Sequence, residues 1–108
     1  MKPVSQFTFL SSASATGAGA ELGNGSGEAL VFAVSGTFSA EITAQGYLGG
    51  AWYDLMVVDL SDGMTASNVT EAGAYTVPCA YGFEKLRLNV TSYTSGSVTA
   101  VGRMCRTN

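Results

Sequence analysis

Apolar and polar residues alternate along two stretches near the C-terminal end of the chain. Residues 85–90 read Lys-Leu-Arg-Leu-Asn-Val, so every second side chain is apolar, which is the period of a strand with one buried face. Residues 98–103 alternate more weakly, and the residues between, 93–97, are Tyr-Thr-Ser-Gly-Ser, which favour a turn. The pattern predicts a hairpin of two antiparallel strands over residues 84–103.

Earlier apolar runs, each bounded by glycine, proline or turn residues, predict further strands. They cover residues 28–35, 38–48, 52–60 and 74–78, while the polar segment 64–71 fits a strand or a loop. Together, about seven short strands at roughly ten-residue spacing predict an all-β fold, a single β-sandwich with jelly-roll or immunoglobulin-like Greek-key connections.

The N-terminal quarter of the chain has a different composition. Residues 11–27 are mostly Ser, Ala and Gly, which is typical of a flexible connection. We therefore divide the chain into an N-terminal arm with its Gly/Ser/Ala-rich segment, residues 1–27, and a β-sandwich domain, residues 28–108. Phe7, Phe9 and Leu10 in the arm either pair with the sheet edge of a neighbouring copy or form a strand of their own sheet.

Composition bears on the surface of the molecule. Charged residues make up 12% of the chain, against about 25% in an average domain, so Ser, Thr, Asn and Gly supply much of the polarity. Such a surface suits a protein covered by neighbours, because few charges need desolvating on association. It equally suits a small β domain with hydroxyl-rich faces.

Charge is unevenly distributed along the chain. All eight acidic residues lie at or before Glu84, and four of the five basic residues lie after it. This asymmetry either steers docking between identical copies or onto an acidic shell, or is balanced internally where Lys85 and Arg87 pair with acids of a neighbouring strand, which is the interpretation we favour. The net charge of −3 argues against a nucleic-acid partner, which would require a basic surface.

The residue types present exclude several kinds of catalytic site. The chain has no histidine, which rules out a Ser-His-Asp triad, a Cys-His pair and zinc bound by imidazole. Cys79 and Cys105 form one disulfide or remain two reduced thiols. Asp54, Asp59 and Asp62 match no calcium loop. We predict no enzyme activity, no cofactor and no metal.

Aromatic residues offer one binding alternative. The tryptophan and four of the tyrosines could form a platform on which sugars stack, or they could pack in the core and at interfaces. The residues concerned are Trp52, Tyr53, Tyr75, Tyr81 and Tyr93.

Targeting signals are not visible in the sequence. No run approaches the roughly 20 apolar residues that cross a bilayer, and the first residues lack the apolar core, about 7–15 residues long, of a secretory signal. We expect synthesis in a cytoplasm and no membrane partner.

Four motifs carry a family resemblance. They are Val-Ser-Gly-Thr-Phe (34–38), Gly-Gly-Ala-Trp-Tyr-Asp-Leu (49–55), Glu-Ala-Gly-Ala-Tyr-Thr-Val-Pro (71–78) and Leu-Arg-Leu-Asn-Val-Thr-Ser-Tyr-Thr-Ser-Gly-Ser-Val-Thr (86–99). Over about residues 28–103 this pattern of glycines, aromatic residues and a Thr-Ser-Tyr-Thr-Ser-Gly-Ser turn resembles small β-sandwich structural proteins of tailed bacteriophages and prophages.

The resemblance implies a non-enzymatic virion structural protein. On this interpretation the chain is a capsid decoration or head auxiliary protein that forms a homo-oligomer and binds other virion proteins. The alternatives are a tail, neck or fibre component, or a carbohydrate-binding host-adhesion module. The candidate interface residues are Phe7, Phe9, Leu10, Lys85, Arg87, Tyr93 and Arg103.

Overall fold

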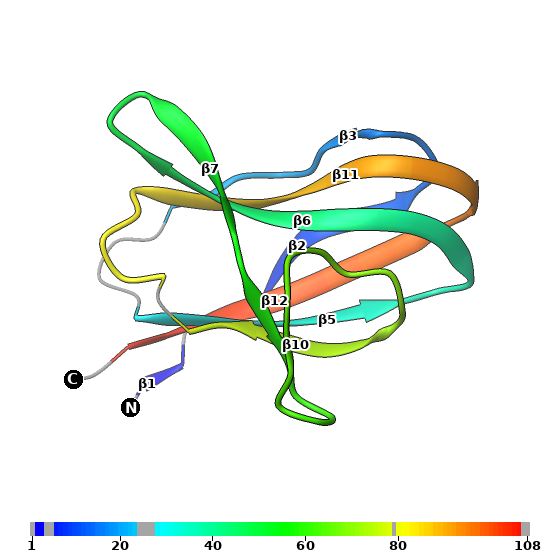
Figure 1. The fold of residues 1–108 in the computed structure, drawn as a ribbon. Coiled ribbons are helices and arrows are strands. Elements are labelled where there is room, and N and C mark those ends of the chain that lie inside the picture. The colour runs from blue at the N-terminus through cyan, green and yellow to red at the C-terminus, as the bar shows by residue number, and fades with distance from the viewer. Residues whose placement is uncertain (1, 4–5, 24–27, 79, 107–108) are drawn as a thin grey trace.

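The computed structural model describes residues 2–3, 6–23, 28–78 and 80–106. Within them every regular element is a β-strand, and the strands form two antiparallel sheets in two layers (Figure 1). The prediction of an all-β fold is confirmed. The described residues contain twelve strands, several only two residues long, where about seven were expected from the sequence.

The first sheet, called sheet A, has the strand order β1-β12-β5-β10-β8-β9, and β2 also pairs with β12. Its strands are β1 (Lys2–Pro3), β2 (Phe7–Ala13), β5 (Ala29–Ser35), β8 (Val57–Asp59), β9 (Thr65–Ala66), β10 (Gly73–Val77) and β12 (Val98–Arg106).

The second sheet, called sheet B, has the order β3-β11-β6-β7, and β4 also pairs with β11. Its strands are β3 (Gly17–Ala18), β4 (Leu22–Gly23), β6 (Phe38–Leu48), β7 (Ala51–Leu55) and β11 (Lys85–Gly96).

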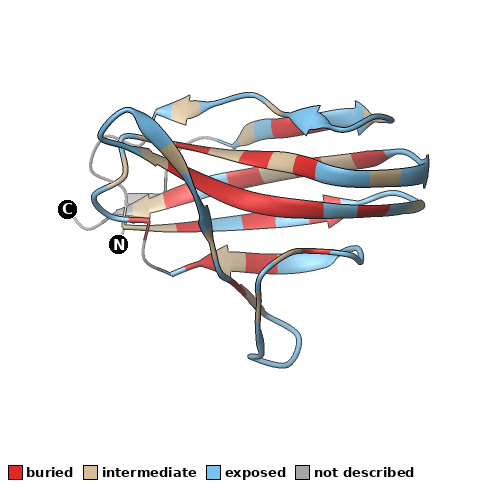
Figure 2. Ribbon diagram, turned by 45° about the horizontal axis from the view of Figure 1, so that its top comes forward, coloured by how far each residue is buried: buried red, intermediate tan, exposed pale blue. Residues whose placement is uncertain are grey.

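One hydrophobic core lies between the two sheets (Figure 2). In β11, the predicted alternation is confirmed, because Leu86, Leu88 and Val90 are buried while the polar residues between them face outward. Across the core β5 contributes Leu30, Phe32 and Val34, which are also buried. Burying each such side chain stabilises the fold by about 1.5–3 kcal/mol.

The predicted hairpin over residues 84–103 is wrong. Strand β11 belongs to sheet B and β12 to sheet A, so the two strands face each other across the core instead of pairing. The turn falls at Gly96 and Ser97, after the predicted turn residues have extended β11. Both strands are apolar on their inner faces, and a crossover between layers buries these faces as well as a hairpin does.

A second crossover runs beside the first. Strand β5 of sheet A continues through Gly36 and Thr37 into β6 of sheet B, and the backbone N–H of Ser97 donates a hydrogen bond to the carbonyl oxygen of Thr37 at 3.1 Å. Both crossovers lie at the same end of the molecule (Figure 1). A glycine occupies each, with φ of 110° at Gly36 and 88° at Gly96, values that favour glycine.

The N-terminal residues are part of the same two sheets, which differs from the expected arm. Strand β2 pairs with β12, and Phe9 and Leu10 are 2% and 5% exposed in the core. Beyond β2, the chain adds β3 and β4 to the edge of sheet B. The small residues of this segment lie close to the sheets and form backbone hydrogen bonds with them. For example, the backbone N–H of Gly19 donates to the carbonyl oxygen of Leu88 at 2.8 Å. Residues 24–27 of the predicted flexible segment lie outside the described residues.

Candidate functional site

Two rows of side chains cross the outer face of sheet B. In the first row Lys85 on β11 lies opposite Tyr47 on β6, which lies opposite Trp52 on β7. In the second row, two residues along, Arg87 is opposite Gln45 and Gln45 is opposite Asp54. Side chains directly opposite on neighbouring strands are close enough to interact. We call these six residues the sheet B cluster.

The first row joins a cation to two aromatic rings. The ammonium nitrogen of Lys85 lies 4.6 Å from the centroid of the Tyr47 ring and 3.3 Å from the carboxylate of Glu21. The rings of Tyr47 and Trp52 are 5.1 Å apart between centroids. Lys85 therefore has its charge partner within its own chain, in the segment between β3 and β4.

The second row centres on Arg87. Its guanidinium carbon lies 3.9 Å from the centroid of the Trp52 ring, and its Nε donates a hydrogen bond to Gln45 Oε1 at 2.8 Å. The Gln45 amide in turn donates to Asp54 Oδ1 at 2.8 Å. Gln45 is only 9% exposed, so its polar groups are used in bridging a base to an acid.

This arrangement leaves little of the tryptophan for a ligand. A sugar stacks on the face of an aromatic ring, and the guanidinium of Arg87 already lies over one face of Trp52. Of the other predicted platform residues, Tyr75 is buried, and Tyr93 uses its hydroxyl to donate to the carbonyl of Gly96 at 2.7 Å. Tyr53 and Tyr81 are exposed, and Tyr53 lies on the face of β7 opposite to Trp52. The geometry therefore disfavours a carbohydrate platform centred on Trp52.

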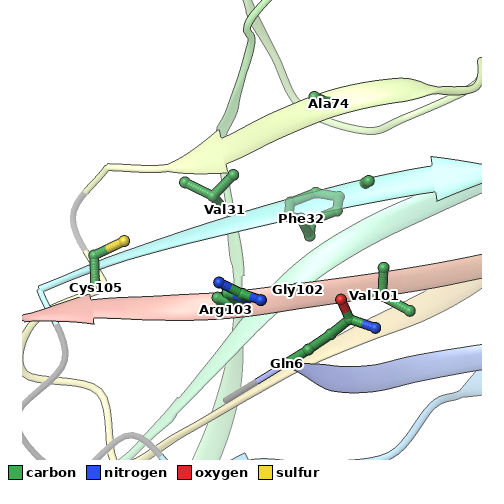
Figure 3. Close-up of a pocket in the computed structure, with 9 residues that line it drawn as sticks. Gln6, Val31, Phe32, Ala74, Val101, Gly102, Arg103 and Cys105 are labelled. Atoms are coloured by element: carbon green, nitrogen blue, oxygen red, sulfur yellow. The ribbon is translucent and has the colours of Figure 1, made fainter. Parts of the chain in front are cut away.

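A second surface lies on the outer face of sheet A. An open hollow of about 390 Å³ runs across β10, β5 and β12 (Figure 3). Ala74, Ala33 and Val101 form one cross-strand row in it, and Val31 and Arg103 stand opposite each other in the next. The remaining lining residues are Gln6, Phe32, Gly102 and Cys105.

The hollow is mostly apolar, and Gln6 and Arg103 are the polar side chains of its described lining. Val31 is 38% exposed and the alanines on β5 and β10 are exposed beside it, whereas Arg103 carries the only charge among the described residues of the lining. A sheet with apolar residues on its outer face is usually covered by another layer. The hollow therefore leaves apolar side chains of sheet A uncovered.

The predicted interface residues are separated by this structure. Phe9 and Leu10 are in the core, and Phe7 is half-buried with its ring 4.9 Å from that of Phe9. Lys85 and Arg87 are on sheet B, Tyr93 packs against the core, and Arg103 lies in the hollow on the opposite sheet. The structure brings none of the predicted bases on β11 together with Arg103.

Sequence reasoning missed the alanines and valines of the hollow. A signal was present, because residues 29–34 read Ala-Leu-Val-Phe-Ala-Val and are apolar on both faces of the strand. A strand of that kind is normally covered on both faces. One face is covered by the core, and the other is the floor of the hollow.

The aspartates of residues 59–62 shape a turn. Oδ1 of Asp59 accepts hydrogen bonds from the backbone N–H and hydroxyl of Ser61, at 2.9 and 2.8 Å, and these bonds hold the pKa of its carboxyl below the usual 3.8. Oδ1 of Asp62 accepts from the N–H of Met64 at 2.9 Å. Among the described residues, no three His, Cys, Asp or Glu side chains are grouped to hold a metal ion.

The fold defines an all-β protein with two antiparallel sheets. Comparison with known families shows which proteins share it: a family model described as XepA matches residues 3–104. The chain belongs to the XepA family.

Two solved structures share the fold. SPBc2 prophage-derived protein YomS is 26% identical, with a TM-score of 0.85 over 96% of this chain and 95% of YomS. PBSX exported protein XepA is 25% identical, with a TM-score of 0.87 over 95% of this chain. This chain spans only 37% of XepA. No curated protein matches the chain.

These matches identify a phage-related protein, as the resemblance in the sequence implied. The described part of the chain contains no helix that is long and apolar enough to cross a membrane.

Proposed function

We propose that this chain is a non-enzymatic structural protein of the phage particle that acts by binding neighbouring virion proteins, most specifically as a capsid decoration or head auxiliary protein. The observation that carries the proposal is the apolar hollow on the outer face of sheet A. An exposed apolar sheet face in a protein with so few charges is suited to contact with another protein.

The membership of the XepA family and the likeness to a prophage-derived protein support a role in the phage life cycle. The two outer faces support binding in different ways. On sheet B the charges of the cluster already have partners, because Lys85 pairs with Glu21 and Gln45 bridges Arg87 to Asp54, so that face resists further desolvation. On sheet A the valines and alanines carry no polar groups that would need new partners. Sheet A is therefore the proposed contact face, and a homo-oligomer is the simplest assembly that covers it.

One observation favours a second candidate. XepA is described as an exported protein, and the family is shared with this chain. On that basis the chain could instead act outside the particle, as an exported accessory protein of the prophage. A tail, neck or fibre component would share the first proposal's location in the particle but not its site on the head.

The location of the chain after prophage induction separates these candidates. Particles would be purified on a density gradient, and the chain would be quantified by mass spectrometry in intact particles, separated heads and tails, cells and medium. We expect a fixed ratio of this chain to the major capsid protein in intact particles and in heads. Recovery with tails would favour the tail alternative.

An abundant protein of the host cytoplasm serves as the contamination control in each fraction. Enrichment in the medium without co-purification with particles would overturn the structural proposal and favour the exported candidate. Absence from both particles and medium would contradict both candidates.

A further inference from the structure

Residues 59–64 join β8 to β9 and project from sheet A as a compact loop (Figure 1). The loop closes on itself, because Asp59 N–H donates to the carbonyl of Met64 at 2.9 Å and Gly63 N–H donates to the carbonyl of Asp59 at 2.8 Å. Leu60 and Met64 are nevertheless 51% and 65% exposed. The loop thus presents two large apolar side chains.

The charge of this loop is negative. Asp59 and Asp62 flank Leu60, and both carboxylates cap backbone groups of the turn, which fixes the shape of the loop. A rigid loop with apolar side chains loses little conformational entropy when it binds. We call residues 59–64 the acidic knob.

The hollow of sheet A is complementary to the knob in both respects. Its floor consists of small apolar residues, Ala33, Ala74 and Val101, and Arg103 supplies a positive charge. None of residues 59–64 lines the hollow of its own chain. In a second copy, however, the same hollow offers apolar contact for Leu60 and Met64 and a cation for the acids.

We propose that the acidic knob of one copy inserts into the sheet A hollow of a second copy. The inference rests on the proposed function and names the contact by which copies would associate. Such a contact joins two different surfaces, so it is heterologous, and repetition of it either closes a ring or extends a filament. Arg103 and Asp62 would then give the contact its polarity and orientation.

The test uses two variants of the full chain that each remove one half of the contact. Ala33→Trp fills the hollow from an exposed strand position, and Leu60→Ser with Met64→Ser removes the apolar tip of the knob. Ala18→Trp on the exposed surface of β3 and Met56→Ser, whose side chain is 58% exposed outside the knob, are the matched controls. Thermal unfolding of every variant shows that it is folded.

Sedimentation velocity over a concentration series gives the assembly state. We expect the unaltered chain and both controls to associate, and each half-contact variant to associate about thirtyfold more weakly. Mixed together, the two half-contact variants should form a one-to-one dimer that grows no further, because the intact hollow of the knob variant accepts the intact knob of the other. Arg103→Glu should weaken association of the unaltered chain, and added salt should weaken it as well.

Each other outcome overturns the inference. An unaltered chain that stays monomeric has no such contact, and half-contact variants that still assemble place the contact elsewhere. Variants that fail singly and also fail when mixed contradict insertion of the knob into the hollow. Loss of association in Ala33→Trp alone, with the knob variant still associating, indicates hollow-to-hollow pairing, which is isologous. A monomeric chain that still co-purifies with particles would reject this contact while leaving the proposed function intact.

Discussion

The backbone N–H of Ser97 donates a hydrogen bond to the carbonyl oxygen of Thr37 at 3.1 Å, and this bond joins the two segments that pass between the sheets. The segment at Thr37 leads from β5 to β6, and the segment at Ser97 leads from β11 to β12. Strands β5 and β12 are paired in sheet A, and β6 and β11 are paired in sheet B. The bond therefore links the two crossover segments at the end of the molecule where both pairs of strands pass from one sheet to the other.

The two crossovers fit together only if residue 96 has no side chain. Gly96 has a φ of 88°, and a β-carbon there would collide with the carbonyl oxygen of Thr37. We predict that Gly96→Ala lowers the unfolding free energy by about 1–3 kcal/mol, through strain at positive φ and displacement of the neighbouring backbone. For a domain of this size each kcal/mol lowers the Tm by about 4–8 °C.

A matched control is available at Gly23 on β4, where an added β-carbon meets nothing within 4 Å. Calorimetry or circular dichroism melts of the two alanine variants would measure the difference. Equal melting temperatures for Gly96→Ala and Gly23→Ala would show that the crossovers are not packed as described.

The crossovers also show how far the sequence predicts the fold. The alternation of Leu86, Leu88 and Val90 predicts a strand with one buried face, and the structure agrees. The same alternation does not say whether the next strand lies beside β11 or across the core, because a turn of Ser and Gly permits either. That choice depends on which layer covers the inner faces of β11 and β12, and such long-range packing leaves no local signal.

The candidate surfaces were predictable to different degrees. Lys85 and Arg87 were recognisable as an outward row, but Gln45 and Trp52 come from other strands and Glu21 from the segment before β4, and only the folded sheet brings these partners together. The hollow was less visible, because alanines and valines on a strand usually indicate core.

The N-terminal segment gives a second prediction. Phe9 is 2% exposed in the core, while its neighbour Thr8 on the same strand is exposed. If β2 is an integral strand, Phe9→Ala should lower the unfolding free energy by about 3–5 kcal/mol, as for other buried aromatic residues, and Thr8→Ala should change it little. Urea unfolding of the two variants measures this. A detached arm would leave both variants as stable as the parent.

The contact between Arg87 and Trp52 gives a third prediction. The guanidinium carbon lies 3.9 Å from the ring centroid, and a cation over an exposed aromatic face is worth about 0.5–1 kcal/mol. A double-mutant cycle of Arg87→Ala and Trp52→Ala should therefore show a coupling energy of about that size.

The control cycle for that coupling pairs Arg87→Ala with Tyr53→Ala. Tyr53 is the next residue along β7, is 54% exposed, and lies on the opposite face of the strand. We expect no coupling there. Chemical denaturation of the variants would supply all the free energies, and a coupling no larger than that of the control would contradict a stabilising stack.

Tyr75 gives a prediction about alkaline pH. Its side chain is buried, and its hydroxyl donates a hydrogen bond to the carbonyl of Glu71 at 2.8 Å. Burial, together with the nearby charges of Asp59, Glu71 and Asp62, raises the pKa of Tyr75 above its usual 10.0. The folded state therefore favours the neutral phenol, and the unfolded state ionises first. The stability contributed by this residue is complete below pH 10.0 and is lost as the pH rises through the folded-state pKa.

The measurement is the unfolding free energy of the chain between pH 8 and pH 11, compared with that of Tyr75→Phe. At pH 8 the variant should be less stable by about 0.5–1.5 kcal/mol, because it lacks the hydrogen bond to Glu71. Above pH 10.0 the parent should lose stability more steeply than the variant, so that the gap between them narrows. Parallel pH profiles would mean that the phenol of Tyr75 ionises as readily in the folded chain as in the unfolded one.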